Sequence, residues 1–224
     1  MTKSTIIFFI SILTFSSLFG QTKKDSLYVF VGEKIEVKEW PQPKSIESID
    51  TTIVEGDTII MKKASLSMDA RFISRYRIVQ QIFGTFKSDT IEFLAFDHYG
   101  TPAFSKYKYV MLFVYNYNGK LYHEKYQYFD VYKTKNGRWA SSYKVRDYEH
   151  DYNKNIMVKP EIIDFVKQVS YKIKGRSKED INYLFPSPYF KIIRRKAIAV
   201  WGNYVEELFE LKKCGILKSR GIFD

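Results

Sequence analysis

The chain has 224 residues and a formal net charge of +11. Aromatic residues make up 17% of it, which excludes an intrinsically disordered chain, because such chains are poor in aromatic residues. Lysine and arginine are scattered along the sequence and are rarely grouped, so the charge favours anionic partners in general without defining a polyanion groove. A solvated, basic surface is the simpler interpretation.

Residues 1–20 have the pattern of a cleavable secretory signal peptide. Lys3 supplies the positive charge, residues 6–19 form a 14-residue apolar run, and cleavage is expected before Gln21. A membrane-spanning helix needs about 20 apolar residues, and no cysteine for a lipid anchor follows the cleavage point. We therefore expect an exported protein, periplasmic or extracellular, with no transmembrane span after cleavage.

Alternating apolar and polar residues predict a series of β-strands up to residue 143. The predicted strands are residues 27–37, 70–83, 90–96, 109–117, 121–133 and 138–143, with a small hairpin at residues 51–61. Asn118-Gly119 and Asn136-Gly137 accept the positive φ of type I′ turns, so consecutive strands are expected to pair antiparallel. This pattern predicts a small antiparallel OB-like β-barrel within residues 21–145.

Residues 109–117 are apolar at nearly every position, so this strand is expected to be buried on both faces. From residue 146 to residue 224 the periodicity becomes helical. Helices are predicted over residues 160–175, 177–185 and 187–215. The expected fold class is therefore α+β, with a helical C-terminal region packed on the barrel.

The segments VFVGEKIEV, RFISRYRIVQQIFG and SDTIEFLAF resemble the opening strands of netrin-like modules, the OB-barrel family that includes tissue inhibitors of metalloproteases. The resemblance covers residues 27–143 and implies a five-stranded barrel. In those inhibitors an N-terminal cysteine chelates the target zinc and disulfides tie the barrel. This chain has one cysteine, Cys214, and an expected mature N-terminus at Gln21, so that inhibitory mechanism does not carry over.

Three histidines each stand beside an acid, in Asp97-His98, His123-Glu124 and Glu149-His150-Asp151. Such a neighbour can orient an imidazole for acid/base chemistry. The spacings match no metal signature, and no hydrolase elbow or nucleotide-binding loop is present, so no metal or cofactor is expected. If the protein is an enzyme, Asp97, His98 and His123 are the candidate catalytic residues. Chance adjacency is the competing interpretation.

Four tyrosines occupy even-numbered positions of the predicted strand 121–133. Alternate residues of a strand point to the same side, so one face of this strand is expected to carry several phenols. They are Tyr122, Tyr126, Tyr128 and Tyr132. Such a platform binds sugars or stacks bases. The competing interpretation places these tyrosines at the boundary with the helices, where they are partly buried.

A compact basic cluster lies early in the predicted helix 187–215. It consists of Lys191, Arg194, Arg195 and Lys196. The cluster is either a docking patch for an anionic partner or a solvated helix face.

Three functional hypotheses remain open. The first is a non-enzymatic binding or interaction module of a bacterial envelope, contacting a glycan, an anionic polymer or a protein. The second is an exported hydrolase with an Asp/His site. The third is a structural assembly subunit, which an exposed apolar patch of interface size would indicate. Nucleic acid fits poorly with export.

Overall fold

The computed structural model describes residues 26–41, 47–54, 57–64, 69–149, 151–153 and 157–223. The predicted signal peptide at residues 1–20 and His150 lie outside these ranges.

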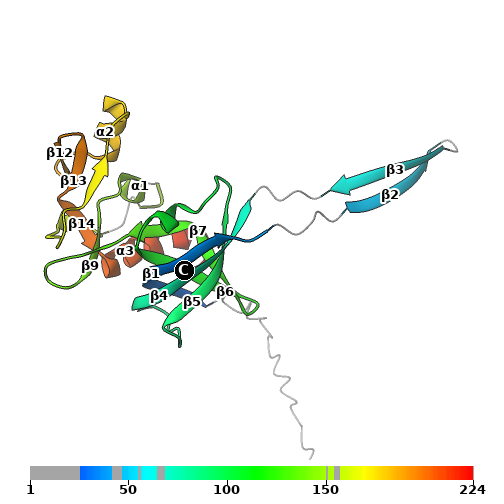
Figure 1. The fold of residues 1–224 in the computed structure, drawn as a ribbon, viewed down its shortest axis with the longest axis horizontal. Helices are drawn as coiled ribbons and strands as arrows, with labels where there is room; N and C mark the ends of the chain where they lie inside the picture. Colours follow the sequence, from blue (N-terminus) through cyan, green and yellow to red (C-terminus); the bar gives the residue numbers. More distant parts are fainter. Residues whose placement is uncertain are drawn as a thin grey trace, which may run out of the picture.

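Five strands close into a barrel at the centre of the molecule (Figure 1). In spatial order they are β1 (Leu27–Glu39), β4 (Ala70–Phe83), β5 (Thr90–Asp97), β7 (Lys120–Asp130) and β6 (Tyr109–Tyr117). All neighbours pair antiparallel except β5 and β7, which run parallel at Leu94 and Tyr122. A small OB-like barrel followed by a C-terminal helix was predicted, and this α+β fold class is confirmed.

The strand β6 and the first part of β1, up to Gly32, are buried on both faces. Phe30 and its ladder partner Leu112 point into the barrel, where they join a core that includes Tyr76 and Phe93. On the opposite face, Val31 and its partner Met111 pack with α3 (Val205–Lys212). The double burial predicted for residues 109–117 is confirmed over Val110 to Val114.

The predicted hairpin is also present and stands apart from the barrel (Figure 1). It consists of β2 (Glu47–Val54) and β3 (Asp57–Ala64), paired antiparallel along their whole length. The hairpin is inserted between the barrel strands β1 and β4.

The C-terminal region contains more strand than the sequence predicts. One sheet has the order β10 (Glu161–Ile162), β14 (Trp201–Tyr204), β9 (Trp139–Ser142) and β8 (Tyr132–Lys133). A second sheet has the order β11 (Ser170–Lys172), β13 (Lys196–Ala199) and β12 (Phe190–Ile193). The predicted sixth meander strand therefore leaves the barrel as β9 and pairs antiparallel with β14.

 Ser142 and its ladder partner Gly202 are 60 residues apart along the chain, and this pairing brings the end of the barrel segment next to the C-terminal region.

Two of the predicted helices are corrected by these strands. The helix predicted over residues 160–175 is wrong, since the chain there forms β10 and β11. The helix predicted over residues 187–215 is right only from Val205 onward, and the part before it forms β12, β13 and β14. The short helix predicted after Ser177 is confirmed as α2 (Lys178–Leu184). Ser177 caps its N-terminus, where Ser177 Oγ accepts a hydrogen bond from Asp180 N at 3.0 Å.

The turn between β12 and β13 explains why residues 187–204 were predicted as part of a helix. Arg194 and Arg195 both have positive φ, 43° and 63°, and form a two-residue hairpin turn between Ile193 and Lys196. Glycine and asparagine usually occupy such positions, so two arginines give no turn signal in the sequence. Apolar residues spaced by four on the two paired strands then imitate a helical stripe.

Gly202 is the tightest point of the β9–β14 pair. A Cβ atom at this position would lie 1.9 Å from Ser141 O. We predict that Gly202→Ala lowers the unfolding free energy by about 3 kcal/mol or more, because the clash is with backbone and cannot be relieved by a rotamer change. Urea unfolding measures the loss.

Gly137→Ala is the matched control, since its Cβ would meet nothing within 4 Å although φ is 83°. We expect a loss of about 1–2 kcal/mol there, from the left-handed backbone alone. Equal losses at the two positions would contradict the close approach at Gly202.

Candidate functional site

The four predicted binding tyrosines do not share one face, because a wide bulge interrupts β7. Val114 lies opposite His123 whereas Leu112 lies opposite Tyr128, so four residues of β7 oppose the single residue between Leu112 and Val114. At the bulge, Tyr126 has a φ of 67°. The bulge reverses the inside/outside alternation, and the single tyrosine face inferred from parity is therefore corrected.

Each tyrosine has a different environment. Tyr122 lies on the outer surface of the barrel, Tyr126 is exposed at the bulge, and Tyr128 packs with the barrel core. Tyr132 belongs to β8, and its hydroxyl donates a hydrogen bond to Asp130 Oδ2 at 2.8 Å. Only Tyr122 thus belongs to the outer groove described below.

The candidate catalytic residues have separate partners. His98 Nδ1 lies 3.5 Å from Asp69 Oδ1, His123 Nε2 lies 2.9 Å from Gln127 O, and Asp97 Oδ1 accepts from Tyr99 N at 2.8 Å. Within the described part of the chain, none of the three bonds to another of the three. Asp97 and His123 do border one small cavity of about 20 Å³, which has room for about one water molecule.

Burial determines the charge of His123. Removal of the ring from water lowers its pKa to about 4, although the hydrogen bond to Gln127 O favours the charged form. The imidazole is therefore neutral at pH 7. It packs against Phe104 in a tilted arrangement, with ring centroids 4.6 Å apart, and acts as part of the barrel core.

The lowered pKa makes stability depend on pH. An unfolded histidine titrates near pH 6.5, so the contribution of neutral His123 is complete above that pH and is lost as the pH falls towards 4. We predict that the difference in unfolding free energy between wild type and His123→Gln changes by about 3 kcal/mol between pH 7 and pH 4. Urea unfolding at both pH values gives this difference. Parallel pH profiles for the two proteins would contradict it.

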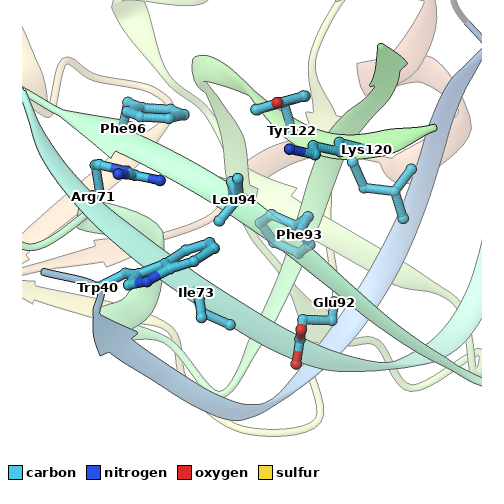
Figure 2. Close-up of a pocket in the computed structure, with 10 residues that line it drawn as sticks. Trp40, Arg71, Ile73, Glu92, Phe93, Leu94, Phe96, Lys120 and Tyr122 are labelled. Atoms are coloured by element: carbon cyan, nitrogen blue, oxygen red, sulfur yellow. The ribbon is translucent and has the colours of Figure 1, made fainter. Parts of the chain in front are cut away.

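A groove of about 350 Å³ lies on the outer face of β4, β5 and β7 (Figure 2). Its floor contains one row of side chains across the three strands: Ile73 faces Leu94 on β5, and Leu94 faces Tyr122 on β7. These positions face outward because the residues that alternate with them, such as Phe72 and Phe93, point into the barrel core.

Aromatic rings continue along this floor. Phe96 stacks on Tyr122 with ring centroids 6.2 Å apart and an angle of 22° between the ring planes. Tyr122 in turn stacks on Tyr115 at 5.6 Å and 25°. Phe96 and Tyr122 line the groove, and Tyr115 extends the stack beyond the lining residues.

Trp40 forms one wall of the groove, at the point where the chain leaves β1. Its backbone N donates to Arg71 O at 2.7 Å, and its ring lies 4.8 Å from the Arg71 guanidinium carbon. Arg71 is the ladder partner of Phe96, so the guanidinium lies among aromatic rings (Figure 2). This arrangement is a cation–π contact at the mouth of the groove.

One polar atom in the groove lacks a partner. Arg71 Nε is buried and, within the described residues, has no hydrogen-bond acceptor. Buried donors are nearly always satisfied, so Arg71 Nε is an exception among the groups that border the groove. Lys120 adds a second cation to the lining and Glu92 the only acid among the lining residues.

The predicted basic cluster stays together, although not on a helix. Arg194 and Arg195 form the tip of the β12–β13 hairpin, with Lys191 and Lys196 on its two strands. All four residues are exposed. They do not line the groove of β4, β5 and β7.

Sequence reasoning missed most of the groove. Trp40 precedes Pro41 and has the pattern of a strand end, and Arg71 has the pattern of the polar face of an alternating strand. Neither pattern indicates a binding site in the sequence. The site becomes visible only in the pairing of β4 with β5, which places Arg71 beside Phe96. The outward aromatic residue at Tyr122 was the one signal visible in the sequence.

No protein-family model, curated protein or solved structure matches the chain. No helix among the described residues is long and apolar enough to cross a membrane. The histidines, cysteine and acids of the same residues form no group of three or more that could hold a metal ion.

Proposed function

We propose that the protein is an exported, non-enzymatic binding module that holds an acidic glycan of a bacterial envelope in the groove of β4, β5 and β7. The observation that carries the proposal is the Arg71 guanidinium, which lies on the Trp40 ring with a buried Nε that has no acceptor among the described residues. A carboxylate on a sugar pairs with the charge of this guanidinium, which borders the groove.

The remaining lining supports a sugar chain. Trp40 is 40% exposed, and together with Phe96 and Tyr122 it offers flat apolar surfaces on which sugar rings stack. The groove volume lies within the range of small-ligand sites, about 300–1,000 Å³. The outer surface of the second and third strands is also the usual ligand surface of OB barrels.

The alternative of a hydrolase receives less support. Asp97, His98 and His123 bond to different partners, and the His123 side chain is buried. A general base needs a substrate proton within hydrogen-bond reach, and the cavity beside His123 holds about one water molecule. A relationship to netrin-like modules stays a proposal as well, supported by the closed five-strand barrel, whose strands lie between Leu27 and Asp130.

Isothermal titration with oligogalacturonate, an acidic glycan, tests the proposal. We expect binding that weakens with salt, and a loss of affinity of about tenfold or more in Trp40→Ala, because one aromatic stacking contact is worth about 1–3 kcal/mol. Arg71→Gln is expected to lose about fivefold or more, since a charge-assisted hydrogen bond is removed.

Matched controls exist on the same molecule. Tyr183→Ala removes an aromatic residue that is 50% exposed on α2, and Arg75→Gln removes a cation from the outer face of β4 outside the groove. Both are expected to bind within about twofold of wild type. Equal binding of a neutral maltooligosaccharide, or tighter binding of oligothymidylate, would overturn the assignment of an acidic glycan.

The β2–β3 hairpin favours a second candidate, the assembly subunit. Its strands expose Ile53 (72%), Ile60 (61%) and Met61 (47%), and an isolated two-stranded hairpin is only marginally stable in water. If the hairpin pairs with another copy, light scattering will show a concentration-dependent oligomer that Ile53→Thr together with Ile60→Thr dissociates. A monomer at all concentrations would contradict this candidate.

A further inference from the structure

A second cavity, of about 400 Å³, lies where the barrel meets the C-terminal region. It shares no lining residue with the groove of β4, β5 and β7. Tyr128 comes from the barrel strand β7, and Phe185 and Phe190 come from the chain around β12. Tyr107 and Tyr126 add further aromatic surface, so the cavity is lined by rings from both parts of the protein.

One wall of the cavity is a buried polar cluster centred on Asp130. The Asp130 side chain is 2% exposed and accepts hydrogen bonds from Lys144 Nζ at 2.7 Å, Tyr171 OH at 2.7 Å and Tyr132 OH at 2.8 Å. Tyr171 OH also lies 2.7 Å from Ser142 Oγ. Four segments of the chain thus fix this wall in one arrangement.

Electrostatics keep the cluster in a single protonation state. Burial raises the pKa of Asp130, but the Lys144 charge and the three hydrogen bonds more than offset it, so the pKa lies below its usual range. Burial and the neighbouring carboxylate raise the pKa of Tyr171 well above its usual value. Asp130 is therefore a fixed acceptor and Tyr171 a fixed donor at pH 7.

The cluster leaves one donor for another molecule. The Lys144 ammonium has three N–H donors. Asp130 Oδ1 and Tyr171 OH, at 2.7 and 3.2 Å, occupy two of them. The Lys144 side chain is 29% exposed and lines the cavity, so an acceptor placed there can reach it.

The cavity also carries an excess of positive charge. Its two acids are both paired, Asp130 with Lys144 and Asp147 with Lys212. Arg146 and Arg176 line the same cavity, and neither forms an ion pair within the part of the chain that the structure describes. Two arginines without a neutralising carboxylate from these residues therefore line the cavity.

We propose that this cavity is a second binding site, for a small organic anion that consists of a flat ring bearing a carboxylate or phosphate. The ring packs among the tyrosines and Phe185, and the anionic group bonds to Arg146, Arg176 and the remaining Lys144 donor. Carboxylate and phosphate share the geometry that guanidinium recognises, and the aromatic lining supplies the apolar contact.

Phenyl phosphate and benzoate are the probes, and benzyl alcohol is the neutral comparison. Titration of the ¹⁵N-labelled full chain followed by NMR is expected to give saturable shifts around Tyr128 and Lys144 for at least one anion. Arg146→Gln together with Arg176→Gln is expected to weaken that binding at least tenfold. Lysine at both positions keeps the charges and is expected to restore part of it. The stronger anion identifies the preferred group.

Two control variants separate this site from the others. Lys191→Gln with Arg195→Gln removes the same charge from the β12–β13 hairpin and is expected to leave binding within about twofold. Trp40→Ala removes a wall of the groove and is expected to have no effect, so failure here is distinguishable from failure of the glycan proposal. Benzyl alcohol binding as tightly as the anions, equal losses in the two double variants, or no saturable shift would overturn the proposal.

Discussion

The structure depends on the burial of β1 and β6 between two apolar layers. Phe30 and Leu112 close the barrel interior, while Val31 and Met111 require a second cover on the outside. Leu208 of α3 belongs to that cover. Leaving this face in water would cost about 25 cal/mol for each Å² of apolar surface, so the cover that α3 provides stabilises the barrel.

The bulge in β7 distributes side chains among the sites. Before it, Tyr122 points outward into the groove and His123 points inward; after it, Tyr128 points inward. Tyr126, at the bulge itself, borders the second cavity. Because the bulge reverses which residues of β7 point outward, tyrosines of this single strand line both the groove and the second cavity. Bulges commonly re-aim side chains in this way near binding sites.

Local signals in the sequence were sufficient for the barrel. Strand alternation and the Asn118-Gly119 turn predicted its strands, because a half-buried strand must alternate and a tight hairpin needs positive φ. The same signals failed after residue 160. There the strands are only two to four residues long, too short to show alternation, and Arg194-Arg195 forms a turn without glycine. The groove could not be predicted from the sequence for another reason. It depends on the register between β4 and β5, which places Arg71 beside Phe96, and on the hydrogen bond from Trp40 N to Arg71 O.

The contact between α3 and β1 joins two segments that lie far apart in the sequence. Residues 205–217 cover the outer face of β1, which begins at Leu27. A contact of this kind closes a long loop of chain before it contributes stability, so it slows folding. Until it forms, an apolar surface of the barrel stays open to water and to other chains.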